Sequence, residues 1–126
     1  MSSKGPKVEI YKKANGERPF PEWMARMRDH VGEARIDARI TRIMSSGNYG
    51  DCQPVGEGVS ELRVHEGPGY RVYFGQLGEE LVVILCGGTK RTQDADIPKA
   101  QALWADYKDR RAKAKEAKKG KKDGAH

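Results

Sequence analysis

The segment VSELRVHEGPGYRVYFGQLGEELVVILC, residues 59–86, decides the fold. Three runs in it, residues 59–65, 70–74 and 81–86, have the pattern of β-strands, and the turn-rich links EGPG and GQLGEE separate them. Short links of this kind join antiparallel strands, so the segment predicts an antiparallel meander. The third run is apolar throughout, which is typical of a central strand covered on both faces.

Strand and helix patterns flank the meander on both sides. Residues 8–13, VEIYKK, predict a short strand, and a further short strand is expected near residues 52–55. Residues 20–31 and 32–47 carry apolar side chains at helical spacing, and residues 96–108 do the same after the meander. The expected fold class is therefore α+β, with an N-terminal helical hairpin and a C-terminal helix packed on a small, mainly antiparallel sheet.

The charge of the chain is unevenly distributed. Its 126 residues carry a net charge of +6, but residues 1–107 hold fifteen Lys/Arg and fifteen Asp/Glu, whereas residues 108–126 hold nine and three. The folded part is neutral overall, so an anion-binding site on it needs local clustering of cations. We expect one domain over residues 1–109 and a basic, disordered tail over residues 110–126, which has no apolar residue larger than alanine.

The two cysteines give no sign of a disulfide framework or a metal site. Cys52 and Cys86 are 34 residues apart, without CxxC spacing or a nearby pair of histidines. No apolar run approaches the roughly 18 residues that span a bilayer. The expectation is a protein of the reducing cytoplasm, without a membrane span, a metal or a cofactor.

Strand alternation places several polar side chains on one face of the meander. Glu61, Arg63 and His65 alternate with apolar residues in the first strand, and Arg71 and Tyr73 do so in the second. If the apolar sets face the core, these side chains project together from the open side of the sheet. The residues that follow the third strand emerge at the same edge, and they include Lys90, Arg91 and Gln93. The expected result is one concave basic patch.

Such a patch suits a phosphodiester. Cleaving RNA through its own 2′-hydroxyl needs a proton acceptor, cations around the phosphorus centre and a proton donor for the leaving oxygen, and it needs no metal. Arg71 and Arg63 are expected to hold the phosphate, and Lys90 and Arg91 to stabilise the transition state. His65 titrates near neutrality and is the candidate proton carrier.

Two aromatic and polar side chains complete the candidate site, and each member has a structural alternative. Tyr73 is expected to stack on a base, and Gln93 to contact RNA. Against this, an arginine on a strand face is often paired with a carboxylate, which for Arg71 is Glu61 or Glu66. A histidine at a strand end, such as His65, is commonly an ordinary surface residue.

The run GVSELRVHEGPGYRVYF followed by LVVILCGGTKRTQDADI resembles the addiction-module killer proteins. These form a branch of the RelE/ParE superfamily of type II toxin–antitoxin toxins, close to the HigB-like host-killing group. The resemblance covers about residues 7–107. It implies a RelE-like fold and a ribosome-dependent endoribonuclease that cleaves translated mRNA and is silenced by a cognate helix-turn-helix antitoxin.

The resemblance assigns roles to some residues and departs from the family at another place. Arg71 falls on the arginine of the family's glycine-tyrosine-arginine strand, Arg63 on its basic strand position, and Lys90-Arg91 on its lysine-arginine pair. The best-known RelE toxins carry a further catalytic tyrosine near the C-terminal end, where this chain reads TQDADIP. Two other functions therefore stay open: a ParE-like inhibitor of DNA gyrase without nuclease activity, and an inactive regulatory partner of the antitoxin.

Overall fold

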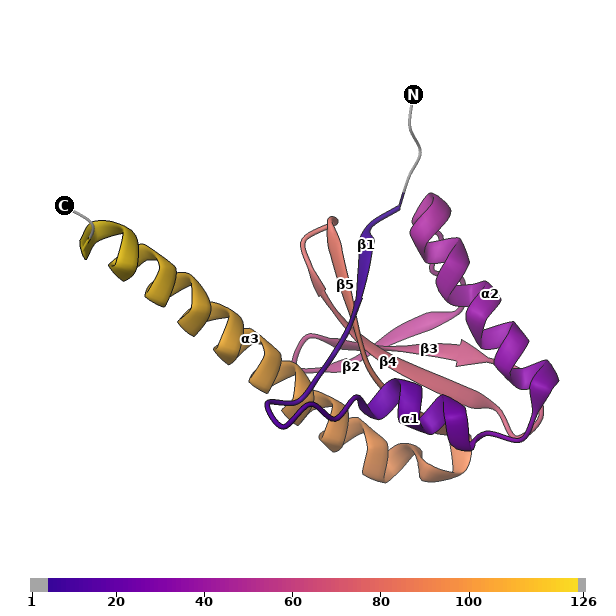
Figure 1. Cartoon of the computed structure of the whole chain (residues 1–126). Helices are drawn as coiled ribbons and strands as arrows, with labels where there is room; N and C mark the ends of the chain where they lie inside the picture. The colour runs from indigo at the N-terminus through magenta and orange to yellow at the C-terminus, as the bar shows by residue number, and fades with distance from the viewer. Residues whose placement is uncertain (1–4, 125–126) are drawn as a thin grey trace.

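The computed structural model describes residues 5–124, with side chains for residues 5–119. Five strands form one sheet in the order β1-β5-β4-β3-β2 (Figure 1). Their bounds are β1 Lys7–Ile10, β2 Cys52–Gly56, β3 Val59–Val64, β4 Tyr70–Leu77 and β5 Leu81–Thr89. Strands β2 to β5 pair antiparallel with their sequence neighbours, whereas β1 pairs parallel with β5. The predicted meander, both flanking strands and the α+β class are confirmed.

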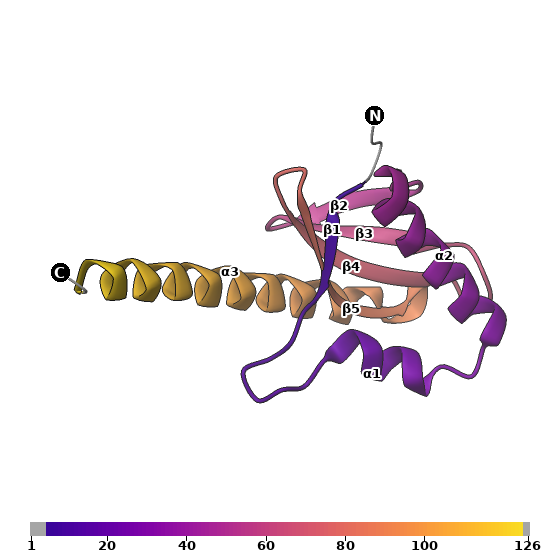
Figure 2. The same cartoon turned by 45° about the horizontal axis from the view of Figure 1, so that its top comes forward.

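Three α-helices and one 3₁₀ turn complete the chain. They are α1 (Pro19–Arg26), α2 (His30–Ser46), η1 (Lys90–Thr92) and α3 (Gln93–Gly124). Figures 1 and 2 show α1 and α2 lying over the sheet in different directions. Helix α1 packs mainly on β5, and α2 on β3 and β4. The structure therefore does not show the expected helical hairpin.

The first helix ends before the predicted position, and Asp29 begins the next helix. The predicted helix over residues 20–31 stops at Arg26, and Asp29 caps the start of α2 by accepting a hydrogen bond of 2.9 Å from the backbone N–H of Gly32. The same carboxylate accepts a 2.7 Å bond from the hydroxyl of Tyr70. Val31, the last residue of the predicted helix, lies in α2 and is 56% exposed. A local capping interaction thus overrides the apolar spacing.

The sheet separates two cores. On one face, α1 and α2 cover a cluster that includes Ile36, Leu62, Val72, Phe74 and Ile84. On the other face, α3 covers a second cluster that includes Val59, Tyr73, Val83, Leu85 and Trp104. Strand β5 contributes to both clusters, which confirms the prediction of a central strand covered on both faces. The structure is a three-layer arrangement, with the sheet in the middle (Figure 2).

Helix α3 begins on the sheet and then leaves it. Its first turns pack on β5 and β4, while its C-terminal half extends away from all other elements (Figures 1 and 2). The segment expected to be a disordered tail, residues 110–126, is the continuation of this helix up to Gly124, and residues 125–126 lie outside the described part. The domain boundary at residue 109 stays a prediction. Among residues 5–124, no helix combines the length and the apolar character that a membrane span requires.

The two edge strands are short. Strand β1 has four residues and follows Pro6, and β2 has five residues with Pro54 at its centre. The pairing of β2 with β3 shifts register between Pro54 and Gly56. Proline cannot donate to a strand ladder, and this confines it to edge strands and bulges.

Candidate functional site

The polar residues of β3 and β4 lie directly opposite one another on the face that α3 covers. Glu61 is opposite Tyr73, and Arg63 is opposite Arg71 in the antiparallel register. The alternation predicted from the sequence is therefore confirmed. The expectation that this face is open is wrong for Arg71 and Tyr73, which are 6% and 0% exposed. The cause is α3, whose apolar stripe requires the same sheet face.

The carboxylate of Glu61 is the centre of this cluster. It is fully buried and accepts hydrogen bonds from Arg63 Nε at 3.0 Å, from the Tyr73 hydroxyl at 3.2 Å and from Gln93 Nε2 at 2.6 Å. Arg71 Nε lies 3.7 Å from the same carboxylate, in ion-pair range. One carboxylate thus holds two arginines and connects β3, β4 and the first residue of α3. We name these five residues, Glu61, Arg63, Arg71, Tyr73 and Gln93, the Glu61 cluster.

Arg71 is incompletely satisfied in this cluster. Its Nη1 donates a 3.3 Å hydrogen bond to the carbonyl of Tyr70, but its buried Nε has no hydrogen-bond partner among the described residues. An unpaired buried donor on a cation is costly, because the group has lost water without gaining an acceptor. The buried Nε is out of reach of a ligand, so any contact of Arg71 with an anion has to be made by the Nη end of the guanidinium, which lies beside Gly69.

Lys90 and Arg71 both lie next to Gly69. The backbone N–H of Lys90 donates a 2.8 Å hydrogen bond to the carbonyl of Gly69. A Cβ added to Gly69 would lie 3.5 Å from Lys90 Cβ and 3.8 Å from Arg71 Nη1, so the absence of a side chain there leaves space beside both cations. Gly69 also has a φ of 82°, which favours glycine. Lys90 and Arg91 are both exposed, as expected.

His65 lies at the same end of the sheet but is bonded elsewhere. It follows β3 in the turn that leads to Gly69, and its side chain is 69% exposed. Its Nε2 lies 2.5 Å from Asp51 Oδ2, and this interaction is the main reason that the pKa of Asp51 is lowered. Within residues 5–119, no hydrogen bond or ion pair joins His65 to Arg71 or Lys90. A carboxylate in this position orients an imidazole.

Arg63 and Tyr73 are less available for a ligand than the sequence suggests. Arg63 is half-buried, with Nε on Glu61 and Nη2 donating a 2.9 Å bond to Gln53 Oε1. Burial, followed by the charge of Glu61, raises the pKa of Tyr73, so this phenol stays protonated. The prediction that Tyr73 stacks on a base is wrong, because its ring is buried inside the second core.

Gln93 is also used inside the protein, since its amide is the donor to Glu61 at the start of α3. Sequence reasoning missed the central role of Glu61 and treated it only as a possible partner of Arg71. A signal was available: a carboxylate on the same strand face as two arginines, one beside it and one across the ladder. Asp51 was missed because it lies in a loop, far from His65 along the chain.

The Glu61 cluster together with Lys90 and Arg91 is positive by itself, whereas the carboxylates of Asp94 and Asp96 follow in the first turn of α3. Glu61 offsets one of the two arginines of its cluster, and exposed Lys90 and Arg91 add two further cations. A cleft of about 340 Å³ opens beside η1, and its lining balances three cations with three carboxylates: Lys13, Arg26 and Lys99 with Glu17, Glu22 and Asp96. Among the described residues, no three His, Cys, Asp or Glu side chains are grouped closely enough to hold a metal ion. Of these groups, Arg71 and Lys90 beside Gly69 are the ones suited to an anion of phosphate type.

Comparison with known proteins gives one clear relative. No family model matches the chain. The chain is 45% identical over 84 residues to an uncharacterized protein of Haemophilus influenzae, and this match covers 67% of the chain and 84% of that protein. Identity at this level over most of both sequences shows common descent. The chain belongs to the same protein family as this Haemophilus influenzae protein.

Proposed function

We propose that this protein is the toxin of a type II toxin–antitoxin system with a RelE-like fold, and that it acts in the cytoplasm as a ribosome-dependent mRNA endoribonuclease. The observation that carries the proposal is the position of Gly69, which leaves space beside both Arg71 Nη1 and the side chain of exposed Lys90. The resemblance of the strand and loop motifs to the addiction-module killer proteins supplies the reaction.

In the proposed mechanism the scissile phosphate lies over Gly69. The Nη end of Arg71 holds a non-bridging oxygen, and the ammonium of Lys90 approaches from the solvent side. Both cations then stabilise the negative charge that builds around phosphorus. This electrostatic stabilisation is strongest where water is partly excluded. Arg91 contacts the neighbouring phosphate, and the adjacent cleft beside η1 provides room for a nucleotide.

Proton transfer is assigned to His65 together with Asp51. The imidazole accepts the proton of the 2′-hydroxyl as its oxygen attacks phosphorus, and Asp51 orients the ring at 2.5 Å. The P–O5′ bond then breaks, and a water molecule protonates the departing 5′-oxygen. The Glu61 cluster has a different task. Glu61 holds Arg63 and Arg71 in fixed rotamers, and it is a positioning residue because it is fully buried.

A second function, a ParE-like gyrase inhibitor without nuclease activity, has one observation in its favour. Glu61 and Tyr73, next to Arg71, are buried, and His65 bonds to Asp51 rather than to the arginines. A protein that only binds its target does not need a proton carrier next to its cations. The inactive regulatory partner is the third possibility, and the same experiment separates all three.

The experiment is induced expression of the chain alone, with growth and mRNA integrity measured together. We expect growth arrest with cuts inside translated reading frames. Lys90→Ala and His65→Ala change exposed side chains, so they should reduce cleavage by about 10²-fold without loss of folding. Lys7→Ala on β1, an exposed lysine away from the site, is the matched control. Arrest with DNA damage and intact mRNA would favour the gyrase inhibitor, and no arrest would favour the regulatory partner.

The cognate antitoxin is expected to be a small helix-turn-helix protein encoded by a neighbouring reading frame. Complementary charge over Lys90 and Arg91 would raise its association rate more than its final affinity. Co-expression and purification through a tag on the toxin test this expectation. A stable complex that no longer cuts mRNA supports it, and a toxin recovered alone contradicts it.

A further inference from the structure

The C-terminal half of α3 forms an arm that makes few contacts with the rest of the protein. Its last tertiary contact in the hydrogen-bond network is Arg110, which donates to the carbonyl of Lys12 and pairs with Asp106. From residue 111 to residue 119 every side chain is exposed. Figures 1 and 2 show this part of the helix projecting into solvent.

The cations of this arm are concentrated on one side of the helix. At 100° per residue, five of them fall within an arc of about 100°. We call these five residues the basic stripe: Lys108, Arg111, Lys115, Lys118 and Lys119. The two acidic residues of the segment, Asp109 and Glu116, lie about 110° to 130° from the centre of the arc. The separation of charge by face is not visible in the net charge of the tail.

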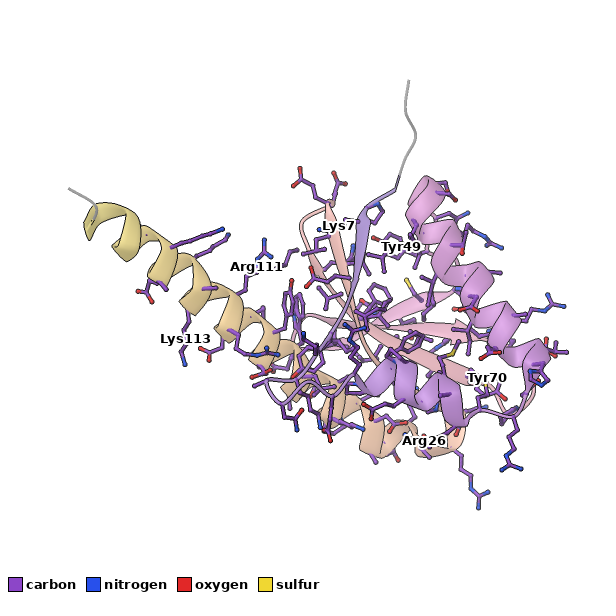
Figure 3. All side chains as sticks on the ribbon, in the orientation of Figure 1. Lys7, Arg26, Tyr49, Tyr70, Arg111 and Lys113 are labelled. Atoms are coloured by element: carbon purple, nitrogen blue, oxygen red, sulfur yellow. The ribbon has the colours of Figure 1, made fainter. Side chains whose placement is uncertain are left out.

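Ion pairs on the arm use the cations outside the stripe. Arg110 pairs with Asp106 at 2.8 Å and Lys113 pairs with Asp109 at 3.1 Å. Figure 3 shows Arg111, a member of the stripe, and Lys113 on opposite sides of the helix. Among the side chains that the structure describes, no carboxylate pairs with Lys108, Arg111, Lys115 or Lys118.

The stripe works against the helix that carries it. Like charges at i and i+4, such as Arg111 with Lys115 and Lys115 with Lys119, destabilise an isolated helix. Apolar packing does not offset this repulsion, because residues 108–119 include no apolar side chain larger than alanine. A polyanion laid along the stripe would remove this repulsion. The five cations cover about 16 Å of the helix axis.

The chemistry of the arm selects among polyanions. An anionic membrane is bound by helices whose opposite face carries large apolar residues, and this arm has none. Single-stranded nucleic acid is held by aromatic side chains on which bases stack, and the nearest aromatic, Tyr107, is already stacked on Trp104. What remains is a fixed row of cations, which suits a regular row of phosphates on a double helix.

We infer that the basic stripe of α3 is a binding surface for the phosphate backbone of double-helical nucleic acid. This surface is separate from the Glu61 cluster and from Lys90, so its binding does not require cleavage. On a ribosome-dependent toxin it would hold the protein near structured RNA, but the inference stands without the proposed nuclease function.

The test measures binding of the full chain to a 20-base-pair RNA duplex and to a DNA duplex of the same sequence, by fluorescence anisotropy over a series of salt concentrations. The stripe variant is Lys115→Gln with Lys118→Gln. The control variant is Lys12→Gln with Lys113→Gln, which removes the same charge from exposed or paired positions off the stripe. Circular dichroism verifies that both variants keep their helix content.

We expect the stripe variant to reduce the slope of log affinity against log salt by about 2, or about 1 for each lost phosphate contact. The control should reduce it by less than half as much. Tighter binding of the RNA duplex would identify RNA as the source of the phosphates, and tighter binding of the DNA duplex would identify DNA.

Three results would overturn the inference. The first is absence of duplex binding by the full chain at low salt, and the second is an equal loss in the stripe variant and the control. The third is that polyglutamate or phosphatidylserine vesicles bind the full chain more tightly than either duplex does. None of these results depends on cleavage, so a failure here is distinguishable from a failure of the nuclease proposal.

Discussion

Replacing Glu61 by glutamine should destabilise the protein strongly, although the two side chains have nearly the same shape. The carboxylate is fully buried and serves two arginines, a phenol and an amide. Glutamine has one acceptor oxygen instead of two, and its NH₂ group would face donors such as Gln93 Nε2 at a distance of 2.6 Å. It also leaves two guanidinium groups without their shared counter-charge.

The size of the stability loss depends on which of the two arginines can be hydrated once the carboxylate is gone. Removing one partner of a buried ion pair costs about 3–5 kcal/mol. The Arg63 side chain is 29% exposed and can regain hydration, whereas Arg71 is shielded and cannot. The loss should therefore lie near the lower end, about 3 kcal/mol. For a chain of this size that corresponds to a fall in Tm of roughly 12 °C.

Urea unfolding followed by tryptophan fluorescence measures this loss, because Trp104 lies in the second core and becomes exposed on unfolding. Glu79→Gln, in the exposed turn between β4 and β5, is the matched control and should stay within about 0.5 kcal/mol. The double variant Glu61→Gln with Arg71→Met removes the uncompensated charge as well. It should recover about 1–2 kcal/mol relative to the sum of the single variants.

Two outcomes would refute this reasoning. If Glu61→Gln is as stable as the Glu79→Gln control, the carboxylate does not hold the two arginines. If the double variant shows purely additive losses, the cost does not come from the charge of Arg71.

Three further perturbations have outcomes that the structure determines. Gly75→Ala should lose about 2 kcal/mol in urea unfolding, because an added Cβ would overlap the indole ring of Trp104. Hydrogen bonds from a backbone N–H and from Tyr70 lower the pKa of Asp29, so the stability it contributes is present above pH 4 and is lost as pH falls below that. Burial and the same bond raise the pKa of Tyr70 to about 12, so its contribution is lost as pH rises from about 10 to 12. Asp29→Asn should flatten the acid side of a plot of urea midpoint against pH. Truncation just after Arg110 should leave Tm unchanged, whereas removing Arg110 as well should lower it, since that residue donates to the carbonyl of Lys12.

The strands could be predicted from the sequence because their signals are local. The alternation in β3 and β4 and the turn-rich links lie within a single segment, so the order and the faces of residues 59–86 follow from spacing alone. The apolar stripe of α3 was readable for the same reason. The start of α2 was harder to predict, because the carboxylate of Asp29 that caps it is also held by Tyr70, 41 positions away in the chain.

The sequence predicted which residues of the candidate site lie together, but not whether they are exposed. The sequence groups Arg63, Arg71 and Tyr73 on one face, and the structure confirms that grouping. Whether that face is open depends on where α3 crosses the sheet, which is a property of tertiary packing. Neutralisation by Glu61 is likewise a matter of three-dimensional placement, and it changes which of these side chains a ligand could reach.

The proline within β2 bears on how the protein behaves at high concentration. Exposed edge strands are templates onto which another chain can add, and this is a common route to aggregation. Pro54 removes one ladder donor from that edge, and the register shift beside it bends what remains. On the opposite edge β1 is only four residues long and Pro6 precedes it. Both edge strands therefore disfavour the addition of a strand from another molecule. Contacts with other molecules are then left to the helices and loops.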